Sequence, residues 1–81
     1  MMIRLRVEHY PIKAGWAAFS PEIGLTSGGR DKSIADANLV RTATSFFRAY
    51  ARGNSIDELI KRRAYDAMDD GNRDIAVELF S

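Results

Sequence analysis

The chain has 81 residues, of which 46% are hydrophobic and 28% charged, and its formal net charge is +1. This length leaves room for one hydrophobic core, so we expect a single domain over residues 1–81 with no separate DNA-binding domain. The absence of cysteine excludes disulfide bonds and thiolate metal sites. The apolar runs are too short to predict a transmembrane helix or a signal peptide.

The first part of the chain is predicted to form strands. Alternating or short apolar stretches bounded by turn residues predict three of them, over residues 3–9, 16–19 and 23–27. The first is expected to end before Pro11, which has no N–H for a sheet, and to pair with the second as a hairpin. Gly28 and Gly29 are expected to end the third strand, since positive φ is accessible to glycine. Short connections favour an antiparallel arrangement of all three strands.

The period of the apolar residues then changes to that of a helix. One predicted face contains Ala35, Leu39, Val40, Ala43, Phe46, Phe47 and Tyr50. Ser33 is the predicted N-cap, with Asp36 as its partner in a capping-box arrangement. Gly53 is expected to end the helix at the C′ position. We expect Phe46, Phe47 and Tyr50 to cover one side of the sheet.

A second helix is expected after Gly53. Ser55 and Glu58 form a capping box, and Gly71 provides a stop. The apolar stripe of this helix is Ile56, Leu59, Ile60, Ala64, Ala67 and Met68. Residues 75–79 alternate again and predict a closing strand, although residues 74–80 also suit a helix. The predicted fold class is α+β, in the order β-β-β-α-α-β, with one long helix packed on one face of a small antiparallel-rich sheet.

The sequence gives little support for catalysis. His9 is the only histidine, at the end of a strand, and nothing marks a nucleophile beside it. The C-terminal acidic residues do not have the spacing of a calcium-binding loop. No catalytic residue, metal or cofactor is therefore predicted.

Part of the chain resembles the HicB-like antitoxin family. The similarity lies in residues 15–24, Gly-Trp-Ala-Ala-Phe-Ser-Pro-Glu-Ile-Gly, in Thr-Ser-Gly-Gly at 26–29, and in the helix that starts at Ser33, so it covers about residues 1–52. The resemblance implies a degenerate ribonuclease-H-like fold without nuclease activity. It also implies a protein that binds and blocks a small basic toxin that cleaves messenger RNA. The absence of cysteine fits the cytoplasm as its location. The residues after Gly53 are too few for the helix-turn-helix that many members carry.

The charge distribution suggests where such a partner binds. Residues 1–52 contain eight Lys or Arg and four Asp or Glu, whereas residues 53–81 contain four and seven. An acidic segment suits a basic partner. The candidate carboxylates are Asp57, Asp66, Asp69, Asp70 and Asp74. Trp16 is either part of the core or an anchor at the interface. Unpaired strand edges favour a homodimer or a higher oligomer.

Two other functions remain open at this point. The polar side of the long helix carries Arg41, Arg48 and Arg52, which could follow a nucleic-acid backbone. The nearly neutral net charge and the lack of aromatic residues on that side count against nucleic acid as a partner. The same scaffold could also serve as a phage-type inhibitor of another enzyme.

Overall fold

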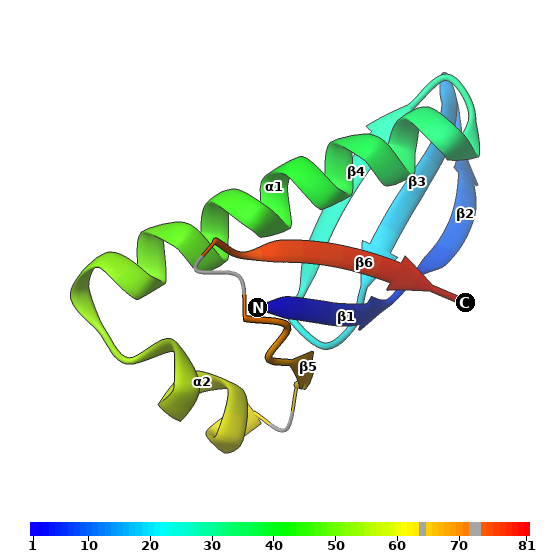
Figure 1. Cartoon of the computed structure of the whole chain (residues 1–81). Helices are drawn as coiled ribbons and strands as arrows, with labels where there is room; N and C mark the ends of the chain where they lie inside the picture. Colours follow the sequence, from blue (N-terminus) through cyan, green and yellow to red (C-terminus); the bar gives the residue numbers. More distant parts are fainter. Residues whose placement is uncertain (64, 72–73) are drawn as a thin grey trace.

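The computed structural model describes residues 1–63, 65–71 and 74–81, and it confirms the α+β class. The strands are β1 (Met2–Arg6), β2 (Glu8–Ile12), β3 (Gly15–Ser20), β4 (Leu25–Gly29), β5 (Asp66–Met68) and β6 (Ala76–Phe80). The helices are α1 (Lys32–Gly53) and α2 (Ile56–Arg63). The long helix packs against strands of both sheets, while α2 and β5 lie at one end of the molecule (Figure 1).

The strands form two sheets, with the orders β5-β1-β6 and β2-β3-β4. Within the second sheet both pairings are antiparallel, as predicted. In the first sheet β5 runs antiparallel to β1, but β6 runs parallel to it, with Ile3 opposite Val77. The chain's first and last strands therefore lie side by side.

The prediction of one strand over residues 3–9 is wrong, because the chain changes sheets at Val7. The Val7 N–H donates to the Phe80 carbonyl at 2.8 Å, and its buried side chain packs in a cluster with Ala18 and Leu39. The hairpin to β3 starts only at Glu8. It continues past the predicted end at Pro11, since β2 lies at an edge of its sheet, where a residue without an N–H is tolerated.

Gly28 and Gly29 do not form the predicted turn with positive φ. Both lie within β4, and the positive φ values belong to Gly15, Gly24 and Gly71. Gly29 instead allows the start of α1 to approach the sheet, because a Cβ there would lie 2.6 Å from the backbone nitrogen of Ala35.

The long helix is confirmed, but both of its ends differ from the prediction. Asp31, and not Ser33, is the N-cap, and its Oδ1 accepts from the Ile34 N–H at 2.8 Å. Asp36 is not part of a capping box, since its Oδ1 lies 2.6 Å from His9 Nε2 on β2. Gly53 is the last helical residue, and the C-cap is Asn54, whose N–H donates to the Tyr50 carbonyl at 3.0 Å.

The second helix is shorter than predicted. Its cap is confirmed, since Ser55 Oγ accepts from the Glu58 N–H at 3.3 Å. It ends at Arg63, and residues 66–68 form β5, with Ala67 opposite Ile3 on β1. Pairing with a strand distant in sequence therefore overrides the local helix propensity. Ala64 of the predicted stripe lies outside the described residues, whereas the predicted closing strand is confirmed as β6.

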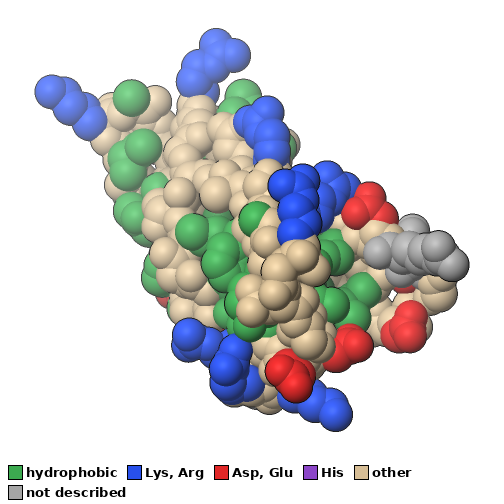
Figure 2. All heavy atoms as spheres, turned by 90° about the vertical axis from the view of Figure 1, so that its left-hand side faces the viewer, with side chains coloured by type: hydrophobic (Ala, Val, Ile, Leu, Met, Phe, Trp, Pro, Cys, Tyr) green, Lys and Arg blue, Asp and Glu red, His purple; other side chains and the backbone are tan. Residues whose placement is uncertain are grey.

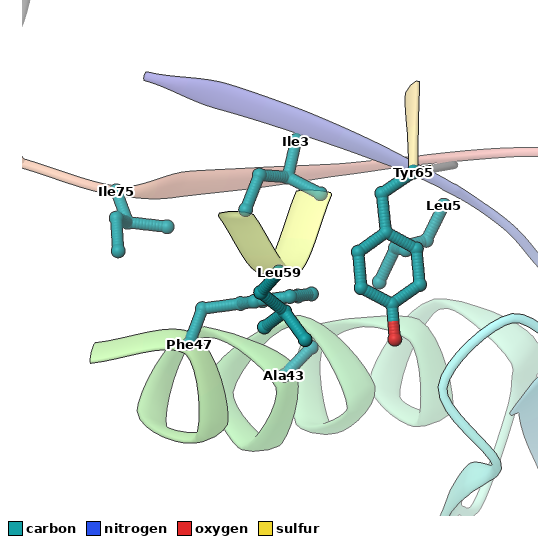
Figure 3. Packing of buried hydrophobic residues seen from close by; sticks show 7 residues of the cluster. All are labelled: Ile3, Leu5, Ala43, Phe47, Leu59, Tyr65 and Ile75. Atoms are coloured by element: carbon teal, nitrogen blue, oxygen red, sulfur yellow. The ribbon is translucent and has the colours of Figure 1, made fainter. Parts of the chain in front are cut away.

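The larger hydrophobic cluster lies between α1, the β5-β1-β6 sheet and α2 (Figure 3). It consists of Ile3, Leu5, Ala43, Phe47, Leu59, Tyr65 and Ile75. Phe47 is fully buried and Tyr50 packs against the cluster, as predicted. The prediction for Phe46 is wrong, because 39% of this residue is exposed.

Candidate protein-binding site

Two of the five predicted carboxylates lie around a depression between α2 and the segment of β5. Asp57, in the first turn of α2, and Asp69, just after β5, are both among its lining residues. The other lining residues are Met1, Ile60, Lys61 and Ala67. We call this surface the acidic depression; its volume is about 330 Å³. Figure 2 looks onto this end of the molecule and shows acidic side chains gathered on one side, next to hydrophobic ones.

Local structure positions these carboxylates. Asp57 lies at the N-terminal end of α2, where the helix dipole favours negative charge. Asp69 Oδ1 accepts from the Gly71 N–H at 3.0 Å, which fixes the turn after β5. The neighbouring Asp70 Oδ1 lies 3.1 Å from the N-terminal ammonium of Met1. The end of β5 and the start of β1 are thereby tied together next to the depression.

The other three predicted carboxylates, Asp66, Asp70 and Asp74, do not line the depression, and arginines pair with Asp66 and Asp74. Asp66 Oδ2 accepts from Arg4 Nη1 at 3.3 Å. Asp74 accepts from Arg48 through both oxygens, at 3.1 and 2.7 Å. The hydrogen bonds from the Arg48 side chain and from the Ile75 N–H lower the pKa of the Asp74 carboxyl.

Trp16 does not join the acidic residues. It lies on β3, half-buried, with the Lys32 ammonium 4.5 Å from the centroid of its ring. The start of β3 is at the end of the molecule away from α2 and β5 (Figure 1). Trp16 therefore belongs to the contact between the second sheet and the start of α1.

The three arginines of α1 are not equally available to a phosphate backbone. Arg41 donates to the Asn38 side-chain oxygen, and Arg48 is held by Asp74. Arg52 lies near Arg48 and Asp74 around a shallow hollow. A carboxylate thus sits in the middle of the row, which weakens its attraction for phosphate.

Sequence reasoning missed the apolar floor of the acidic depression. Ala67 was assigned to a helix, and no periodic pattern connects Met1 with Ile60 or Ala67. Their proximity comes from the pairing of β1 with β5. The apolar floor therefore depends on a contact between segments more than 60 residues apart in the sequence, which local patterns do not reveal.

Comparison with known protein families, with curated proteins and with solved structures finds no match to this chain. Among the residues that the structure describes, no three His, Asp or Glu side chains are grouped so that they could hold a metal ion. In the same ranges, no helix combines the length and the apolar character that crossing a membrane requires. Function is therefore inferred from the geometry of the surface.

Proposed function

We propose that this chain is a non-catalytic protein-binding module, an antitoxin similar to the HicB-like family, that binds and neutralises a small basic toxin that cleaves messenger RNA. The observation that supports this proposal is the acidic depression, which combines an apolar floor with carboxylates. Protein interfaces have the same organisation, an apolar centre with a polar rim.

The depression suits a lysine or arginine side chain of the partner. Its aliphatic stem would pack on Met1, Ile60 and Ala67, and its charged end would reach Asp57 or Asp69. Lys61 on the same surface limits how many positive charges fit there. The excess of acidic over basic residues in 53–81 would attract a basic protein over a longer range and speed its association.

The ion pair between Arg4 and Asp66 extends this surface along β5. Both side chains are exposed, at 41% and 59%, and exposed ion pairs contribute only about 0–1 kcal/mol. An arginine of the partner could replace Arg4 at Asp66 with little loss of stability. Asp66 therefore remains part of the proposed interface although it lies outside the depression.

The proposal also places the chain in the cytoplasm, where messenger RNA is translated. We propose that it forms a homodimer through a strand edge. Both β4 and β6 lie at an end of their sheets, and edge strands present backbone groups for pairing. Neither edge belongs to the acidic depression, so dimerisation and toxin binding are compatible.

The test is co-expression with the small basic protein encoded by the neighbouring reading frame. We expect a complex that elutes as one species from a sizing column and that no longer cleaves messenger RNA. The variant Asp57→Asn/Asp69→Asn should weaken binding by about tenfold at low salt, since rim charges mainly affect association. Its matched control, Glu8→Gln/Glu78→Gln, removes two exposed charges from β2 and β6. The proposal fails if the two proteins elute separately, or if both variants weaken binding equally.

A further inference from the structure

Another surface hollow lies between α1, α2 and the turn that joins β3 to β4. It is a groove of about 540 Å³, and the lining residues that matter for its chemistry are Glu22, Ile23, Phe46, Arg62, Arg63 and Tyr65. It shares no residue with the acidic depression. Its volume lies within the range of about 300–1,000 Å³ that is typical of small-molecule sites.

One wall of the groove is aromatic. The Phe46 ring packs edge-on against Phe47, with centroids 5.1 Å apart, and Phe47 packs edge-on against Tyr65 at 5.5 Å. Because Phe47 is fully buried, it fixes both of its neighbours. Phe46 therefore exposes an apolar ring in a defined position, next to the half-buried Ile23 and the buried Leu59.

The charge of the groove is opposite to that of the acidic depression. Two guanidiniums line it, against the single carboxylate of Glu22. Arg62 is held in place because its Nη2 donates to the Tyr50 hydroxyl at 3.0 Å. Glu22 is already engaged, since its Oε1 accepts from the Arg6 N–H at 2.7 Å. The groove thus favours an anion.

The Tyr65 hydroxyl supplies a hydrogen-bond donor at the groove. Tyr65 is only 9% exposed, but its hydroxyl is not among the buried polar atoms that lack a partner, so the oxygen reaches the surface of the groove. In Figure 3 the Tyr65 ring extends toward α1, and the hydroxyl is at the end of the ring nearest that helix. No hydrogen bond from this hydroxyl to another described residue occupies it, so it can donate to a ligand oxygen in the groove. Burial raises the pKa of this hydroxyl, Arg63 lowers it to a smaller extent and the Glu22 carboxylate raises it, so the hydroxyl stays protonated at neutral pH.

We propose that the groove binds a small organic anion, a carboxylate carried on a flat aromatic body. The ring of the ligand packs on Phe46 and Ile23, which form the accessible part of the apolar wall. Its carboxylate faces Arg62 and Arg63 and accepts from the Tyr65 hydroxyl. Charge-assisted hydrogen bonds of this kind are stronger than neutral ones, and they give the groove its preference for anions. This site is independent of the proposed toxin interface.

The test is an NMR titration of the ¹⁵N-labelled chain with 2-naphthoate. The charge-reversed probe is 2-naphthylmethylamine and the neutral probe is 2-naphthalenemethanol. We expect 2-naphthoate to shift the amide signals of residues 22–24, 46, 62, 63 and 65 and to bind at least about tenfold more tightly than the amine. Equal or tighter binding of the amine, or shifts confined to other residues, overturns the proposal.

Variants test which groups hold the carboxylate. Arg62→Gln and Tyr65→Phe should each weaken 2-naphthoate binding by about three- to tenfold, because each removes one donor. Tyr65→Phe keeps the ring in the core, and the amide spectrum verifies that it folds. Arg30→Gln is the matched control, since Arg30 is exposed next to β4 and does not line the groove. If both groove variants bind 2-naphthoate as the control does, the assignment is wrong.

Discussion

Two adjacent phenylalanines of α1, Phe46 and Phe47, differ in burial because they lie on different faces of the helix. Phe46 and Phe47 have the same chemistry and lie on the same helix, yet only Phe47 is fully buried. The buried residues of α1 are Ala35, Leu39, Ala43 and Phe47, which follow each other at intervals of four. Phe46 is one position, or about 100°, away from that row. It faces the groove instead of the core.

Truncating these two side chains should therefore have unequal effects on stability. Phe47→Ala should lower the free energy of unfolding by about 3–5 kcal/mol, because it leaves a cavity between α1 and Tyr65. Phe46→Ala should lower it by only about 1 kcal/mol, since this ring is already partly in water. Urea unfolding of both variants measures the difference. Losses of equal size would contradict the packing described here.

The ion pair of Arg48 and Asp74 predicts how stability depends on pH. Arg48 lowers the pKa of the folded Asp74 below the ordinary value of 3.8, so in acid the unfolded chain binds more protons at this position. The pair's contribution is present above that ordinary value and is lost as the pH falls through the folded pKa. Arg48→Gln should thus lower the thermal midpoint at neutral pH and leave it nearly unchanged at about pH 2. An unchanged difference at both pH values would show that Asp74 is not held in this way.

At the scale of elements, the helix starts depend on capping side chains that the sequence only partly reveals. Ser55 was predicted correctly, because its partner Glu58 follows at the spacing of a capping box. For α1 two candidates compete, Asp31 and Ser33, and both are good caps. In the structure Asp31 is the cap. The first turn of the helix lies directly against Gly29 at the end of β4, and this close contact between Gly29 and Ala35 requires the helix to begin at Asp31.

Substitution at the two candidate caps tests that assignment. Asp31→Ala should lower the free energy of unfolding by about 0.5–2 kcal/mol, because the Ile34 N–H loses its acceptor. Ser33→Ala should change it little, since serine within the first turn has no capping role and alanine is the better helix former. Thermal unfolding followed by circular dichroism gives both values. A larger effect at Ser33 would restore the cap expected from the sequence.

Sequence patterns predict the elements of this chain with a clear period, but they miss those that depend on pairing between distant segments. Elements with a clear period were predicted, such as the helix over Ala35–Tyr50 and the strand of residues 75–79, because local periodicity reflects which side is buried. The sheet change at Val7 and the strand β5 were missed, since both depend on pairing between the two ends of the chain. The acidic depression depends on β5. The sequence identifies the candidate carboxylates, but it does not show that only Asp57 and Asp69 among them line one surface.

At the scale of the whole molecule, α2 separates two surfaces of opposite charge. Asp57 and Lys61 line the acidic depression, whereas Arg62 and Arg63 line the groove next to Tyr65. Leu59 of α2 is buried in the larger hydrophobic cluster and so holds the helix between the two surfaces. Leu25 and Leu79 pack against this cluster and also against the smaller cluster around Val7 and Leu39. A basic protein and a small anion would therefore bind on different sides of the same short helix.

The most direct measurement of the central proposal is the footprint of the basic partner on the ¹⁵N-labelled chain. We predict that saturation with the small basic protein from the neighbouring reading frame shifts the amides around Met1, Asp57, Ile60, Ala67 and Asp69. Those around Arg41 and in the hairpin of β2 and β3 should keep their positions. A footprint confined to the hairpin, or to the arginine side of α1, would contradict the proposal that the acidic depression is the binding surface.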